Sequence, residues 1–112
     1  MIFIETSIFS KTIQTLLTDD EYRELQGALL ENPARGDLIP GGAGLRKLRW
    51  ARKGMGKSGG LRTVYYWAVY YWAVVQDQIL MVFAYPKSKV ENLTDQQLAL
   101  LVKVAKEEFG NG

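Results

Sequence analysis

The residues of this sequence best suited to chemistry are long cationic side chains gathered in one stretch, 45–62. No acidic residue occurs anywhere from 38 to 76. The stretch holds seven of the fourteen lysines and arginines of the chain, namely Arg46, Lys47, Arg49, Arg52, Lys53, Lys57 and Arg62. Cations concentrated on one surface favour a polyanion over a small molecule. The sequence therefore predicts a cationic surface that binds a polyanion.

The first half of this stretch alternates in character, as a half-buried strand does. Period-2 alternation places Lys47 and Arg49 on one face and Leu48 and Trp50 on the other. The glycine-rich segment that follows can form a hairpin connection and lets a ligand approach the backbone closely. Arg62 opens the next strand, so pairing across the hairpin would bring it beside Lys47 or Arg49.

The composition narrows the chemistry further. The chain has no cysteine and no histidine. This removes disulfides, thiolate nucleophiles, ordinary zinc sites and any histidine acid–base pair. We therefore predict no metal site and no cofactor.

Length and composition predict one soluble globular domain over residues 1–112. The chain is 47% hydrophobic and 23% charged, with acidic residues at both ends and basic residues in the middle. The opening residues lack the basic segment of a secretory signal, so we expect a cytoplasmic protein. The most apolar run, 63–75, is shorter than a membrane-spanning helix and rich in strand-forming residues. We expect no membrane association.

Three helices are predicted from capping patterns and apolar spacing. Thr18 with Glu21, and Thr94 with Gln97, are capping-box pairs that start the second and third helices. The predicted helices run from Ser7 to about Leu17, from Thr18 to Pro33, and from Thr94 to about Phe109. Short apolar runs predict strands at 2–5, 45–52, 61–75 and 79–85, with a loop at 37–44 and a turn at 76–78.

The resulting order, β-α-α-β-β-β-α, predicts an α+β fold around a small, mainly antiparallel sheet. Three consecutive strands can form an antiparallel meander, and helices must cover one face of it. We expect the other face to stay open and to carry Lys47, Arg49 and Arg62.

An immediate tandem repeat interrupts this scheme, because YYWAV occurs at 65–69 and again at 70–74. One continuous strand over 61–75 would span about 50 Å, far longer than its neighbour at 79–85. The repeat must therefore bulge, overhang the sheet or pair with a second chain, and its charge-free edges favour a dimer. Its aromatic residues fit core packing or edge pairing better than base stacking.

Several segments resemble toxins of bacterial toxin–antitoxin systems in the HigB branch of the RelE superfamily. They are NPARGDLIPGGAGLRKLRW, KGMGKSGGLRTVYY and AYPKSKVENLT, and together with the order of elements the resemblance covers nearly the whole chain. It implies a RelE-like fold and a ribosome-dependent endoribonuclease that cuts messenger RNA. It also implies a cognate HigA-type antitoxin carrying a helix-turn-helix domain.

The resemblance assigns roles to individual residues in a metal-independent reaction that uses the RNA 2′-hydroxyl as nucleophile. A lysine crowded by other cations can act as a base, whereas arginine stays charged and clamps phosphate. Lys47 is the expected base, Arg49 and Arg62 the expected phosphate clamps, and Lys87 a further acid or clamp. The expected RNA-binding residues are Arg46, Arg52, Lys53, Lys57, Tyr85 and Lys89.

Two departures from the RelE pattern leave the general acid open. Ser88 stands where RelE has an arginine, and Thr94 stands where RelE has a tyrosine, so Tyr85 or Lys89 would have to substitute. Two other functions compete with the nuclease, a ParE-type gyrase inhibitor and an RNA-binding module without turnover. The basic residues could also be plain solvated surface, but the presence of Lys47, Arg49 and Arg62 together favours the nuclease.

Overall fold

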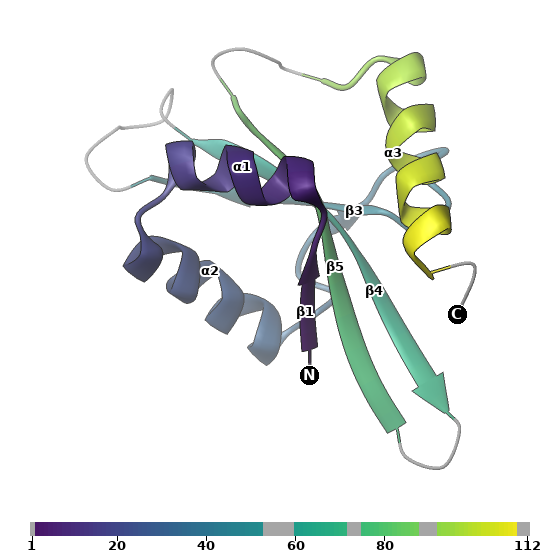
Figure 1. Ribbon diagram of the computed structural model, residues 1–112, viewed down its shortest axis with the longest axis horizontal. Helices are drawn as coiled ribbons and strands as arrows, with labels where there is room; N and C mark the ends of the chain where they lie inside the picture. Colours follow the sequence, from purple (N-terminus) through teal and green to yellow (C-terminus); the bar gives the residue numbers. More distant parts are fainter. Residues whose placement is uncertain (1, 53–59, 72–74, 88–91, 110–112) are drawn as a thin grey trace.

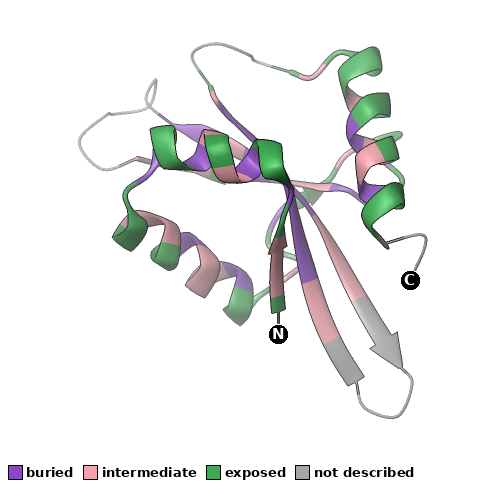
Figure 2. Cartoon of the chain, in the orientation of Figure 1, coloured by how far each residue is buried: buried purple, intermediate pink, exposed green. Residues whose placement is uncertain are grey.

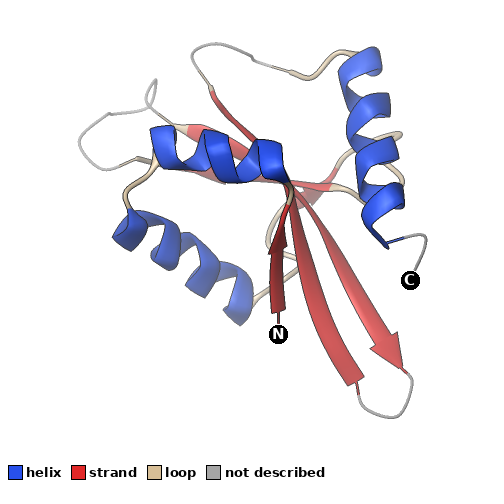
Figure 3. Cartoon of the chain, in the orientation of Figure 1, coloured by secondary structure: helices blue, strands red, loops and turns tan. Residues whose placement is uncertain are grey.

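The computed structural model describes residues 2–52, 60–71, 75–87 and 92–109. Three helices and five strands occur along these residues. Figure 1 and Figure 3 show their arrangement. In chain order they are β1 (Ile2–Glu5), α1 (Ser7–Leu16), α2 (Asp19–Glu31), β2 (Asp37–Leu38), β3 (Arg46–Trp50), β4 (Leu61–Tyr71), β5 (Val75–Pro86) and α3 (Asp95–Phe109). The predicted α+β fold is confirmed, with the short β2 added.

The strands form one mixed sheet in the order β1-β5-β4-β3-β2. β1 runs parallel to β5, and all the other neighbours are antiparallel, so the predicted meander is present. The predicted loop at 37–44 is partly wrong, because Asp37 and Leu38 pair with Lys47 and Arg46. Their pairing with β3 makes β2 an edge strand.

Helices pack against both faces of the sheet, which corrects the expectation of one open face. Beneath α1 and α2, a cluster of buried side chains joins Phe9, Ile13, Leu25 and Leu29 to Leu48, Tyr65, Ile79 and Met81. A second cluster joins Leu101 and Ala105 of α3 to Leu45, Val64, Leu80 and Val82. Alternating strand residues are buried on both sides, so β5 has the continuous apolar character expected of a doubly covered strand.

The helix starts follow the capping rules. Both predicted capping boxes are present, since the Thr18 N–H donates to Glu21 Oε1 at 2.9 Å and the Thr94 N–H donates to Gln97 Oε1 at 2.9 Å. The first helix is capped one residue earlier than predicted. The Thr6 hydroxyl accepts from the Phe9 N–H and donates to the Val82 carbonyl at 2.8 Å, tying the start of α1 to β5.

β5 begins at Val75 rather than at the predicted Ile79, and the β4–β5 hairpin overhangs the sheet. The predicted turn at 76–78 is wrong, because these residues belong to β5 and pair with Tyr70, Val69 and Ala68. The register shifts between Val64 and Tyr65, and β3 pairs with β4 only as far as Tyr65. β1 flanks β5 only from Gln78 to Met81, so beyond Gln78 and its partner Ala68 the two strands form a ribbon that projects from the sheet (Figure 1). Burial decreases along the hairpin toward this ribbon (Figure 2). The extra residue at the register shift is Val82 of β5, so the described part of the repeat overhangs the sheet and does not itself bulge.

In the described part of the chain, no helix combines the length and the apolar character needed to cross a membrane.

Candidate nucleic-acid interface

Three central strands bring Arg49, Arg62 and Tyr85 into one cross-strand row. Arg49 of β3 lies opposite Arg62 of β4, and Arg62 lies opposite Tyr85 of β5. Directly opposed residues of antiparallel strands point to the same face, with Cβ atoms about 4.5–5.5 Å apart. Two arginines and a tyrosine are therefore neighbours on this face. Lys47, two residues before Arg49 on the same strand, shares this face.

The members of the row differ in exposure. Arg49 is exposed, and Arg62 and Lys47 are half-buried. The Tyr85 side chain is only 3% exposed, and its hydroxyl has no hydrogen-bond partner within the described residues. A buried polar group without a partner is uncommon, and such groups often have a functional reason.

The environment of Tyr85 favours the protonated phenol. Burial raises the pKa of Tyr85, and the positive charge of Arg62 offsets this only in part. Its ring lies near Phe83, with ring centres 5.9 Å apart. At neutral pH the hydroxyl is therefore a hydrogen-bond donor beside a guanidinium group.

The row lies beside the first residues of β4 and the last residues of β5. The Lys87 N–H donates to the Gly60 carbonyl at 2.9 Å, which holds the exit of β5 against the start of β4. The Lys87 side chain is exposed. α3 packs on this same face, because Tyr85 and Val64 belong to the cluster beneath it. A bound polyanion would therefore lie beside α3 rather than on an open sheet.

Arg46 is separated from the row, although the sequence analysis grouped it with the RNA-binding residues. It pairs with Tyr65, which belongs to the cluster beneath α1 and α2. Its guanidinium Nη1 donates to the carbonyl of Gly36 at 2.8 Å and to that of Ala34 at 3.3 Å. Arg46 therefore fastens the connection between α2 and β2, and we leave it out of the interface.

The remaining predicted RNA-binding residues divide into two groups. Arg52 is half-buried and follows β3 directly, at the end of the strand nearest the row. The others, Lys53, Lys57 and Lys89, lie outside the described residues.

One residue near the interface was missed by the sequence analysis. Asp37 of β2 lies opposite Lys47 in the strand register, so a carboxylate borders the cationic face. The two-residue strand that places it there has no apolar alternation. The only signal in the sequence is that Asp37 immediately precedes the acid-free stretch.

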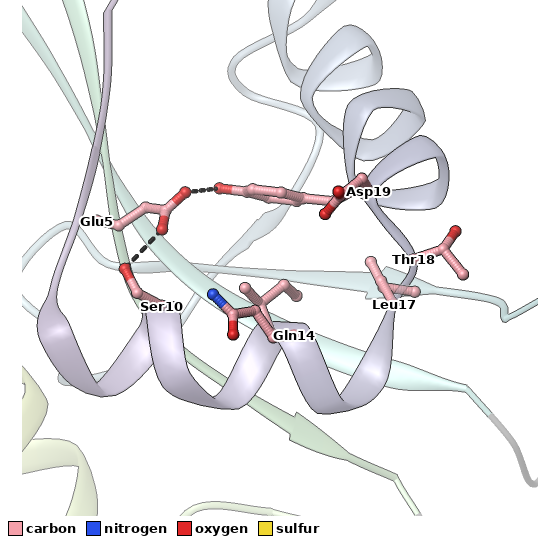
Figure 4. Close-up of a pocket in the computed structure, with 8 residues that line it drawn as sticks. Glu5, Ser10, Gln14, Leu17, Thr18 and Asp19 are labelled. Atoms are coloured by element: carbon pink, nitrogen blue, oxygen red, sulfur yellow. Dashed lines mark hydrogen bonds between the residues drawn. The ribbon is translucent and has the colours of Figure 1, made fainter.

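A shallow pocket of about 210 Å³ lies elsewhere, between β1, α1 and α2 (Figure 4). Glu5 lines it and accepts hydrogen bonds from Ser10 Oγ at 2.6 Å and Tyr22 Oη at 2.7 Å. Burial raises the pKa of Tyr22, and the hydrogen bond and negative charge of Glu5 raise it further. These contacts hold β1 against both helices. The polar groups that line the pocket therefore have a structural role.

A comparison with protein families is consistent with this fold. The model for the RelE toxin of the RelE/RelB toxin–antitoxin system matches residues 2–111. The chain therefore belongs to the RelE toxin family. It is a toxin of a toxin–antitoxin system, with a cognate antitoxin as its partner, and RelE-family toxins are generally endoribonucleases.

Proposed function

We propose that this protein is a HigB-type toxin of a bacterial system and a ribosome-dependent messenger RNA endoribonuclease that inhibits translation. The observation that carries the proposal is the cross-strand row, which aligns Arg49 and Arg62 with the protonated hydroxyl of Tyr85. Lys47 lies on the same face. A base, two phosphate clamps and a proton donor are thus available on neighbouring strands.

The reaction that fits these groups is attack of the RNA 2′-hydroxyl on the adjacent phosphate. The 2′-O–P bond forms while the bond to the 5′-oxygen breaks, which leaves a 2′,3′-cyclic phosphate and a 5′-hydroxyl. Lys47 takes the proton of the nucleophile. Arg49 and Arg62 hold the phosphate oxygens as negative charge develops on them, because guanidinium groups suit planar, bidentate contacts.

Tyr85 is the proton donor in this proposal. Burial keeps the phenol protonated, and its hydroxyl has no partner among the described residues to compete with the leaving oxygen. Lys87 is exposed at the same edge, so it contacts the RNA backbone rather than the leaving group. The proton released to Lys47 and the one donated by Tyr85 balance over one turnover.

The remaining cations anchor the protein to RNA phosphates without base specificity. We assign this role to Arg52, Lys53, Lys57 and Lys89. The site of action places the protein in the cytoplasm with the ribosome, and a HigA-type antitoxin with a helix-turn-helix domain neutralises it. Cleavage on the ribosome follows from the resemblance to HigB toxins.

A purified translation system tests this function. We expect the protein to cut a message bound to programmed ribosomes, with 5′-hydroxyl ends on the downstream fragments, and to leave the naked message intact. Equal cutting of naked RNA would contradict the ribosome dependence. Binding to ribosomes without any cut would favour a module with no turnover.

We also propose that the chain forms a dimer through the ribbon of β4 and β5. β3 pairs with β4 only from Leu61 to Tyr65, so the end of β4 from Trp67 to Tyr71 extends past β3. No charged residue occurs from 63 to 76, so nothing on this stretch opposes edge-to-edge pairing by electrostatic repulsion.

A further inference from the structure

The tandem repeat gives β4 two ways of fitting the same sheet. The six residues Val64–Val69 read VYYWAV, and so do the six residues from Val69 to Val74. β4 could slide lengthwise along its neighbours by five residues, so that each position holds the residue five places later in the sequence. Six consecutive strand positions would then keep the same residue types. A slip by an odd number of residues normally sends every side chain to the wrong face. Here the second copy would supply matching side chains on matching faces.

These six positions include the most constrained part of β4. The Tyr65 side chain is fully buried, its hydroxyl donates to the Pro33 carbonyl at 2.7 Å, and it accepts from the Gly36 N–H at 2.9 Å. Val64 is also fully buried. After the slip, Tyr70 and Val69 would occupy these positions. The core contacts and the hydrogen bonds of this segment would therefore be kept.

The first three positions of β4 would change, and the pairs of Tyr70 with Gln76 and Tyr71 with Val75 would be lost. Tyr66 would replace the buried Leu61, Trp67 would replace Arg62, and Ala68 would replace Thr63. The last exchange is favourable, because the Thr63 hydroxyl is buried without a hydrogen-bond partner among the described residues. The first exchange is unfavourable, because a tyrosine must fit where Leu61 is fully buried.

Both connections of β4 tolerate the slip. At the tip, Tyr71 now pairs with Val75. After the slip, Val74 would oppose Asp77, which leaves a connection of two residues, a very common hairpin length. At the other end, five residues would join the connection between β3 and β4. The entropy of closing a loop grows only with the logarithm of its length, so this change is small.

We propose that β4 exchanges between these two registers, and that the second register disables the toxin. Trp67 then stands opposite Arg49, and Arg62 is withdrawn into the connection. The cross-strand row loses one of its two guanidinium groups. The effect on toxicity rests on the proposed function, whereas the exchange of registers does not.

Disulfide trapping distinguishes the two registers, because the chain has no cysteine of its own. Thr63 pairs with Ala84 in the observed register, so Thr63→Cys with Ala84→Cys reports that state. Ala68 pairs with Gln78, six residues from Ala84 and therefore roughly 20 Å away along the strand. Ala68→Cys with Ala84→Cys can form a disulfide only after the slip, because the Cα atoms must lie within about 7 Å. Both variants are oxidised with diamide and their disulfides are quantified by peptide mass mapping.

Two matched variants complete the experiment. Tyr70→Lys would place a lysine at the buried position of Tyr65 after the slip, so it should abolish the Ala68–Ala84 disulfide and keep the Thr63–Ala84 disulfide. Deletion of residues 70–74 removes the second copy and should do the same. Tyr65→Phe removes the buried hydroxyl only in the observed register, so it should raise the slipped-to-observed ratio roughly tenfold. A full Thr63–Ala84 disulfide without any Ala68–Ala84 disulfide would overturn the proposal.

The variant with Thr63→Cys and Ala84→Cys could fail to fold or to oxidise. Hydrogen exchange on the cysteine-free protein then tests the proposal instead. We expect the amides of residues 61–63 to exchange in two populations, and in one population after Tyr70→Lys. A single protected population in both proteins would overturn the proposal. If the slip is observed but Tyr70→Lys does not increase message cleavage, the disabling effect of the slip is wrong and the exchange of registers stands. If neither protein cleaves the message on ribosomes, the proposed function is wrong and the exchange of registers still stands.

Discussion

At the scale of a single residue, removing the buried hydroxyl of Tyr85 distinguishes a catalytic role from a structural one. Tyr85→Phe removes a group without a hydrogen-bond partner among the described residues, so the free energy of unfolding should change by less than about 1 kcal/mol. Message cleavage should fall by at least about 10²-fold, because the proton donor is lost. Urea unfolding and single-turnover cleavage measure the two effects.

Tyr22→Phe is the matched control for this variant. It removes a hydroxyl that donates to Glu5, away from the cross-strand row, so it should destabilise the protein by about 1 kcal/mol and leave cleavage unchanged. Unchanged cleavage in Tyr85→Phe would remove Tyr85 from the reaction. Equal losses of cleavage in both variants would point to a general effect on the fold.

The sequence predicts the cationic residues of the interface better than it predicts the phenol. Alternation in β3 correctly separates Lys47 and Arg49 from Leu48 and Trp50, and strand pairing correctly brings Arg62 beside Arg49. The same alternation puts Arg46 on the opposite face, although its charge had grouped it with the others. The Tyr85 hydroxyl has no hydrogen-bond partner among the described residues because of its packing beneath α3, which no local pattern encodes.

At the scale of elements, the connection between α2 and β2 depends on a close approach at Gly36. A Cβ atom at this position would lie 2.8 Å from Tyr65 Cε1 and 3.0 Å from the Lys47 carbonyl oxygen. Gly36→Ala should therefore lower the free energy of unfolding by about 1–3 kcal/mol. Because Lys47 belongs to β3, part of this strain would reach the interface.

Gly27→Ala is the control for the loss of a glycine. Gly27 lies inside α2, and nothing lies within 4 Å of an added Cβ atom. This change should stabilise the protein by about 0.5–1 kcal/mol, because alanine favours helix. Chemical unfolding of both variants gives the comparison, and equal effects would contradict the close packing described at Gly36.

The elements were predictable where local chemistry defines them. Thr18 with Glu21 and Thr94 with Gln97 mark the starts of α2 and α3, because a capping box is formed by neighbouring residues. The prediction of a hairpin turn at 76–78 was wrong, because a ribbon that overhangs the sheet can carry polar residues in a strand. The prediction of one open sheet face was also wrong, because the packing of α3 depends on contacts between distant elements.

At the scale of the whole molecule, buried tyrosines make stability depend on alkaline pH. Burial raises the pKa of Tyr22, Tyr65 and Tyr85 above the ordinary value of 10.0. Above about pH 10 the unfolded chain releases these protons while the folded chain keeps them, so stability is full below pH 10 and is lost as pH rises. The urea midpoint should stay level from pH 8 to about 9.5 and then fall. Tyr22→Phe with Tyr85→Phe should reduce the slope, and a midpoint that is level to pH 11 in the unmodified protein would contradict this account.

The proposed dimer is also a property of the whole molecule. Size-exclusion chromatography with light scattering should show twice the mass of one chain at high concentration, and deletion of residues 70–74 should return the mass to that of one chain. The deletion removes Tyr70 and Tyr71 from the overhanging end of β4. A clean monomer for the full chain at high concentration would contradict edge pairing.

The most direct test of the central claim is primer-extension mapping of translated messages in bacteria expressing this chain, Arg62→Ala or the control Arg23→Ala. Arg23 lies on α2 in an exposed ion pair with Asp20 at 3.7 Å, so its loss should change nothing. We expect growth arrest and codon-phased cuts with the unmodified chain and with Arg23→Ala, and a loss of cutting of about 10²–10³-fold with Arg62→Ala. Arrest without cuts would contradict the nuclease and favour a gyrase-type inhibitor, and cuts that persist in Arg62→Ala would contradict the site.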